Sequence, residues 1–163
     1  MRPLILAAAL AALPLLACQR PAPAAPVPPP PAVHPAVPAE PRPFELALVA
    51  PAGARAGQAA TVRVVVTAKE PFHVNKDYPM AFRPEPAAAA AFGGERIPLG
   101  DGATRTPCAA EPAEHCAVDA PLRFTPTAPG PVSLAGTVAF SVCTKEICRI
   151  EKEPVTLAVT VAP

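Results

Sequence analysis

The sequence has few aromatic and few charged side chains. Aromatic residues make up 4% of the 163 residues, tryptophan is absent, and charged residues make up 17% with a formal net charge of +1. A nucleic-acid partner needs a basic surface, often with aromatic side chains for base stacking, and this sequence has neither. We therefore expect no nucleic acid among its partners.

Motifs of hydrolytic and phosphate-binding enzymes are also missing. No serine stands in a nucleophile-elbow pattern, and no glycine-rich phosphate loop is present. Asp77, Asp101 and Asp119 do not pair in a way that indicates hydrolysis. These absences leave the cysteines as the main candidates for chemistry.

The N-terminus has the pattern of a bacterial lipoprotein signal over residues 1–17. Arg2 supplies a positive charge, and residues 4–16 form an apolar run that is too short to span a bilayer comfortably. The run closes with Leu15-Leu16-Ala17-Cys18, which resembles a lipobox. We therefore expect lipid attachment at Cys18. An ordinary cleaved signal with an incidental cysteine is the alternative.

Residues 18–43 combine the lipid attachment with a linker rich in proline and alanine. Proline fixes φ and lacks an N–H, so we expect a disordered tether rather than a helix or a strand. In polyproline II such a segment rises about 3.1 Å per residue and would reach roughly 75 Å. The tether would hold a domain away from a membrane, although a proline-rich ligand for a partner is the alternative.

These N-terminal features predict a protein of the bacterial cell envelope that is lipid-anchored and faces the periplasm. Gln19 follows Cys18. Lipoproteins kept at the inner membrane often have aspartate at that position, so glutamine favours the outer membrane.

Residues 44–163 have a β pattern throughout and are expected to form one domain. Apolar side chains alternate with polar or small ones in several short runs, separated by turns rich in proline and glycine. The runs lie at 44–48, 62–67, 72–75, 122–124, 132–142 and 155–161. This pattern predicts an all-β fold of the antiparallel sandwich type. Most of residues 84–120 is expected to be loop.

Four cysteines remain once Cys18 is assigned to lipid. An even set in an exported protein indicates disulfides, and four cysteines allow three pairings. The local pairing joins Cys108 to Cys116 and Cys143 to Cys148. The first pair lies in a loop rich in proline, alanine and glutamate, where a structural disulfide is expected.

Cys143 and Cys148 lie between two strand-like runs, so the segment reads as a hairpin with a thiol at the end of each arm. Opposed side chains on paired strands lie close enough to form a disulfide, and a partner can reach a hairpin tip. Cys143 is out of phase with the apolar residues of 132–142, which predicts that it points away from the core. The alternative is a structural disulfide, which would contribute about 2 kcal/mol by loop closure.

A copper site is a weaker alternative, because His73, His115 and Met80 show no tight spacing with the cysteines. We therefore expect no metal and no cofactor. His73 is a further candidate for the cysteine site, since a neighbouring imidazole can tune a thiol.

The segment 130–161 resembles the C-terminal half of the periplasmic N-terminal domain of DsbD, a thiol:disulfide interchange protein of the disulfide bond corrector family. The matching parts are the strand Val138-Ala139-Phe140-Ser141-Val142-Cys143, a short loop, Cys148 and a closing β run. Upstream, Phe72-His73-Val74-Asn75 resembles the family's early strand near its active site. Together these parts cover about half of the domain.

The resemblance implies an immunoglobulin-like sandwich in which Cys143 and Cys148 exchange electrons with thioredoxin-like envelope proteins. It implies that Cys148 forms the mixed disulfide and that Cys143 resolves it. The prolines that often follow the second cysteine in the family are replaced by residues 149–152. The family's own electron-supplying domains are not found here, so we expect an external reductant. We also expect the protein to be a monomer. The alternative is a non-enzymatic adaptor lipoprotein whose disulfides are all structural.

Overall fold

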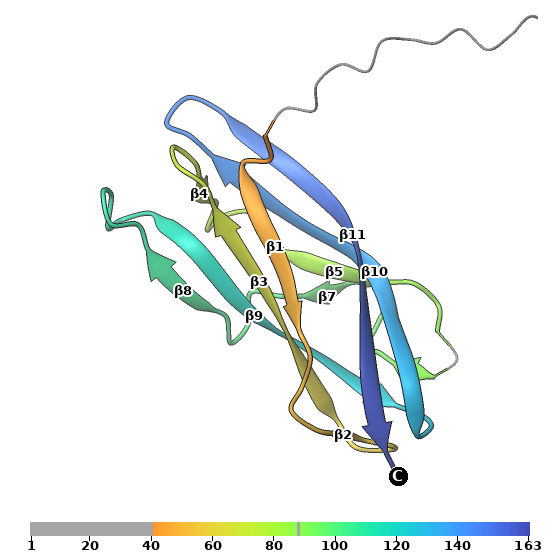
Figure 1. Ribbon diagram of the computed structural model, residues 1–163. Helices are drawn as coiled ribbons and strands as arrows, with labels where there is room; N and C mark the ends of the chain where they lie inside the picture. Colours follow the sequence, from red (N-terminus) through yellow and green to blue (C-terminus); the bar gives the residue numbers. More distant parts are fainter. Residues whose placement is uncertain (1–40, 88) are drawn as a thin grey trace, which may run out of the picture. The chain divides into compact units, whose positions relative to one another are not determined.

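The computed structural model describes residues 41–87 and 89–163 (Figure 1). The predicted signal at 1–17, the lipid attachment at Cys18 and most of the linker 18–43 lie outside these residues. The described part contains no helix, and so none long and apolar enough to cross a membrane.

Strands account for most of the described chain, as the alternating sequence pattern predicted. Their bounds are β1 (Phe44–Val49), β2 (Ala54–Arg55), β3 (Ala60–Ala68), β4 (His73–Val74), β5 (Ala81–Pro84), β6 (Ala90–Ala91), β7 (Ile97–Pro98), β8 (Thr104–Pro107), β9 (His115–Pro126), β10 (Gly130–Cys143) and β11 (Cys148–Ala162).

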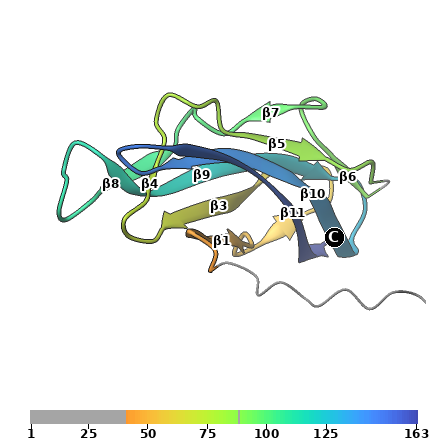
Figure 2. The same cartoon turned by 90° about the horizontal axis from the view of Figure 1, so that it is seen from above.

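The strands curl into two facing layers, as Figures 1 and 2 show. One layer holds β1, β3, β8 and β9, and the other holds β5, β7, β10 and β11. The short strand β4 pairs with both β9 and β10 and so joins the two layers. The predicted all-β sandwich is confirmed. Every pairing is antiparallel except that of β2 with the end of β11, which is a short parallel contact.

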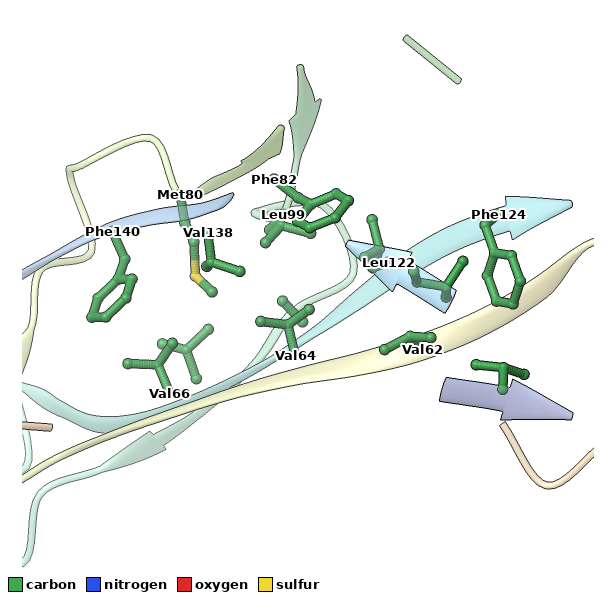
Figure 3. Packing of buried hydrophobic residues seen from close by; sticks show 14 of the residues in the cluster. Val62, Val64, Val66, Met80, Phe82, Leu99, Leu122, Phe124, Val138 and Phe140 are labelled. Carbon is green, nitrogen blue, oxygen red and sulfur yellow. The ribbon is translucent and has the colours of Figure 1, made fainter. Parts of the chain in front are cut away.

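The core lies between the two layers (Figure 3). Alternate residues of β3 point inward, so that Val62, Val64 and Val66 are fully buried. Phe44 and Phe140 meet edge to face across the layers, with ring centroids 4.8 Å apart. Each Å2 of apolar surface that is buried stabilises the fold by about 25 cal/mol. Burial of these side chains is therefore the main source of stability for the sandwich.

The segment 84–120 contains more structure than the predicted loop. Most of it does lie outside strands, but β9 already begins at His115 and Leu99 is buried in the core. Small residues such as Ala117 and Ala120 weaken the apolar alternation there, which is why the sequence pattern did not reveal the strand.

Gly136 in the middle of β10 is a packing requirement, because the Phe82 ring lies where a Cβ would stand. A Cβ would also lie 2.5 Å from the carbonyl oxygen of Arg83. We predict that Gly136→Ala lowers the free energy of unfolding by about 2 kcal/mol or more, since forced overpacking typically costs 1–3 kcal/mol. Urea unfolding measures the change. Gly93→Ala is the control, because a Cβ there meets nothing within 4 Å.

Candidate thiol–disulfide site

The hairpin that joins β10 to β11 carries the Cys143–Cys148 disulfide, with Cα atoms 4.0 Å apart. The two cysteines are opposed in the antiparallel register, as the sequence predicted. A turn between them closes with the Thr144 N–H, which donates to the Ile147 carbonyl at 2.8 Å. The Thr144 hydroxyl accepts from the backbone N–H of Glu146 at 3.2 Å, which holds the turn in place.

The two sulfurs differ in their surroundings. Cys143 is only 4% exposed, whereas Cys148 is exposed. The register puts Cys143 on the opposite side of β10 from buried Val142, and it is not part of the main hydrophobic cluster. The prediction that Cys143 points away from the core therefore agrees with the register.

The same prediction fails to anticipate the burial of Cys143. The chain that leaves β4 runs along β10, and the Asn75 N–H donates to the Ser141 carbonyl at 2.9 Å. This segment continues the pairing of β4 beside the end of β10, and Asn75, Lys76 and Asp77 line a surface cavity together with both cysteines. Cys143 and its in-phase neighbour Ser141 are buried at this end of the strand, on a face that holds exposed or half-buried side chains from Pro131 to Ala139.

His73 lies beside the disulfide, as the sequence suggested. The register pairs His73 with Cys143, and Cys143 with Cys148, so the three side chains form a row on one face of the sheet. The Nε2 atom of His73 lies 3.3 Å from a carboxylate oxygen of Glu114. His73 thus contacts a carboxylate at one end of a row that continues through both cysteines.

Asn75 and Ser141 belong to the site although sequence reasoning did not select them. The Nδ2 atom of Asn75 lies 3.9 Å from the Cys148 sulfur, and the Ser141 hydroxyl lies 4.0 Å from the Cys143 sulfur. Ser141 shares the phase of Cys143 on β10, and Asn75 ends the strand-like run that contains His73. Those two signals could have found them.

The second disulfide, Cys108–Cys116, stands at the same end of the sandwich. It closes the loop between β8 and β9 and lines a surface cavity of about 430 Å3 together with Thr144 and Lys145. The sequence predicted this disulfide as structural but did not predict its place next to the Cys143–Cys148 hairpin.

An ion pair joins the loop of the second disulfide to the cysteine hairpin. The Nζ atom of Lys145 lies 2.6 Å from the Glu111 carboxylate. Hydrogen bonding to Glu111 and the charge of that carboxylate raise the pKa of Lys145, and Glu146 adds to the effect. Lys145 therefore stays positive near the disulfide, although an exposed pair of this kind adds little stability.

The three residues considered for a copper site, His73, His115 and Met80, lie in different surroundings. Met80 packs in the hydrophobic core, and His73 lies beside Cys143. The Nδ1 atom of His115 is buried without a hydrogen-bond partner. Across the described ranges no group of three or more histidine, cysteine, aspartate or glutamate side chains has the arrangement of a metal site.

Apolar side chains flank the exposed sulfur. Ile147 is 57% exposed and Ile150 is 61% exposed, one directly before Cys148 and the other two residues after it. No sequence pattern marked these two residues. They place exposed apolar surface on the hairpin, whereas the cavity at the two cysteines is lined by polar and charged side chains.

Comparisons with known proteins give only distant similarities to solved structures. No protein-family model and no curated protein matches the chain. A cohesin module of a family 33 glycoside hydrolase from Clostridium perfringens is 10% identical, with a TM-score of 0.34, and covers 73% of this chain and 96% of its own. AggA, the major subunit of aggregative adherence fimbriae type I from Escherichia coli, is 11% identical, with a TM-score of 0.31, and covers 73% and 95%. We draw no functional argument from likenesses this distant.

The difference in exposure predicts unequal thiol reactivity. In the folded, reduced protein, iodoacetamide should modify Cys148 well before Cys143, because the reagent must reach the sulfur. Mass spectrometry of the labelled peptides measures both rates. Labelling in urea is the control and should remove the difference. Equal rates in the folded protein would contradict the asymmetry.

Removal of the Cys108–Cys116 disulfide should lower the stability of the protein and leave the exchange of Cys143–Cys148 unchanged. On the chain-entropy model, Cys108→Ala with Cys116→Ala lowers the free energy of unfolding by about 2 to 3 kcal/mol. Urea unfolding measures that loss, and a glutathione titration should still reduce Cys143–Cys148 as in the wild type. A folded variant that no longer exchanges would show that Cys108–Cys116 does more than close its loop.

Proposed function

We propose that this protein is a thiol–disulfide exchange protein of the bacterial cell envelope, in which Cys143 and Cys148 cycle between disulfide and dithiol. The observation that carries the proposal is the exposure of Cys148 next to a buried Cys143. A disulfide used only to hold a hairpin gains nothing from one accessible sulfur. An exchange disulfide needs one, because the attacking thiolate must approach the sulfur in line with the bond.

The exposure difference assigns the two sulfurs different steps. A partner thiolate attacks the Cys148 sulfur, the bond to Cys143 breaks, and its electron pair leaves on the Cys143 sulfur. A mixed disulfide then joins the partner to Cys148. The partner's second thiolate attacks its own sulfur in that bond and releases Cys148 as a thiolate. The partner leaves as a disulfide, and this protein has gained two electrons.

The reverse sequence passes electrons onward. The Cys148 thiolate attacks a partner disulfide, and the Cys143 thiolate resolves the mixed disulfide. Cys143 is buried beside Cys148, so it reaches that bond at once while remaining protected from other reagents.

Partners of the thioredoxin-like class fit the surface around Cys148. Such a partner approaches with a reactive sulfur in a protein surface, and Ile147 and Ile150 offer exposed apolar side chains close in sequence to Cys148. Apolar contact at the centre of an interface excludes water and stabilises a short-lived complex. The expected lipid at Cys18 and the tether after it would keep the domain at a membrane surface facing the periplasm.

A redox titration tests the proposal directly. We expect the Cys143–Cys148 disulfide to equilibrate with glutathione and to have a reduction potential less negative than about −300 mV. Structural disulfides typically have potentials below that value. Alkylation at each glutathione ratio, followed by mass spectrometry, gives the value. A potential below that range would support the adaptor alternative.

Trapping tests the partner. In Cys143→Ser, the resolving sulfur is lost, so Cys148 should accumulate a mixed disulfide with thioredoxin-like proteins of the native envelope. Non-reducing electrophoresis and mass spectrometry identify the adducts. Cys148→Ser is the matched control and should yield far less, because Cys143 is buried. Absence of such adducts in both variants would leave an adaptor with structural disulfides.

A further inference from the structure

Each sulfur of the Cys143–Cys148 disulfide faces a neutral hydrogen-bond donor from a different part of the chain. The Ser141 hydroxyl lies 4.0 Å from the Cys143 sulfur, and the Asn75 amide nitrogen lies 3.9 Å from the Cys148 sulfur. Ser141 comes from β10 itself, whereas Asn75 follows β4. One donor therefore serves the buried sulfur and the other serves the exposed one.

The side chain of Asn75 is held in the orientation that presents its amino group to Cys148. Its Oδ1 atom accepts a hydrogen bond from the backbone N–H of Asp77 at 2.9 Å. Its own backbone N–H donates to the Ser141 carbonyl at 2.9 Å, which anchors the residue against β10. With Oδ1 occupied by the turn, the amide nitrogen is the group left for the sulfur.

Ser141 is a hydroxyl in a buried position, with 1% of its surface exposed. A buried hydroxyl without a partner is costly, so its contact with the Cys143 sulfur matters. Its neighbours on the strand, Phe140 and Val142, point to the opposite face and belong to the core. Alanine would fill the same space without the cost of burying an oxygen.

These contacts gain strength when the disulfide opens. A disulfide sulfur is a weak acceptor, whereas a thiolate is charged, and hydrogen bonds to charged groups are roughly twice as strong as neutral ones. Resting on the proposed exchange function, we propose that Ser141 and Asn75 are the donors that stabilise the thiolates of Cys143 and Cys148. They shift the equilibrium of this disulfide toward the dithiol.

The two donors act at successive steps of the exchange. When a partner thiolate attacks Cys148, the electron pair of the broken bond goes to the Cys143 sulfur, to which the Ser141 hydroxyl donates. When the partner's second thiolate releases Cys148, the electron pair of the mixed disulfide goes to the Cys148 sulfur, to which Asn75 donates. Each donor thus meets the leaving sulfur of one step.

Ser141→Ala and Asn75→Ser remove the two donors while keeping the surroundings. Serine at 75 is neutral and retains an oxygen for the Asp77 N–H, but it is too short to reach Cys148. Ser133→Ala, on an exposed position of the same strand, is the matched control. All three leave in place the titratable groups that line the cavity at the disulfide: His73, Lys76, Asp77, Glu111, Glu114 and Lys145.

The measurement is the equilibrium constant for reduction by glutathione. We expect Ser141→Ala to lower it about tenfold, which corresponds to about 30 mV for a two-electron couple, and Asn75→Ser about threefold. Ser141 has the larger effect because its bond lies in the buried, low-dielectric end of the pair. Asn75→Asp should lower the equilibrium constant more than Asn75→Ser does, since a carboxylate repels the thiolate.

Two further readouts separate this role from a structural one. The difference from wild type should grow as the pH rises, because the donors act on thiolates and not on thiols. Urea unfolding of the oxidised variants should stay close to wild type, because a disulfide sulfur gains little from a donor.

The proposal is overturned if Ser141→Ala and Asn75→Ser keep the wild-type equilibrium at every pH, as Ser133→Ala should. The proposal is also overturned if the oxidised variants lose enough free energy of unfolding to account for the whole change in the glutathione equilibrium constant. Failure of the exchange function itself looks different. In that case partner adducts are absent from Cys143→Ser, while the two donor variants still move the glutathione equilibrium.

Discussion

The pairing of β10 with β11 is the constraint on which the rest of the site depends. The register runs from Gly130 opposite Val161 to Cys143 opposite Cys148. A slip of one residue would move every side chain to the other face and separate the two sulfurs. The hydrophobic face of β10 prevents that slip, since Val138 and Phe140 are fully buried. The core therefore sets the geometry of a disulfide that lies outside it.

The neighbours of this hairpin make its two ends chemically unequal. The segment after β4 pairs beside β10 and brings Asn75 to Cys148, while the loop of the second disulfide reaches the hairpin turn through Glu111 and Lys145. At this end of the sandwich Cys143 is buried and Cys148 is exposed. Two segments distant in sequence reach a pair of cysteines only five positions apart.

Local patterns predicted much of this. Alternation over 62–67 and 132–142 predicted strands with the correct inward faces, because pleating has a period of two. Spacing predicted the hairpin and both disulfide pairings. The early part of β9 was not predicted, since its small side chains hide the alternation, and neither was the short parallel contact of β2, since two residues carry no period.

The residues themselves determine that the domain after the linker is all-β and that Cys143 opposes Cys148, since alternation and hairpin spacing are patterns of neighbouring positions. Which sulfur is open and which donors face the pair was decided only in three dimensions. Asn75 lies 73 positions from Cys148 along the chain, and no spacing rule links residues that distant. Their contact exists because β4 pairs beside β10, and that pairing depends on how the whole sandwich packs.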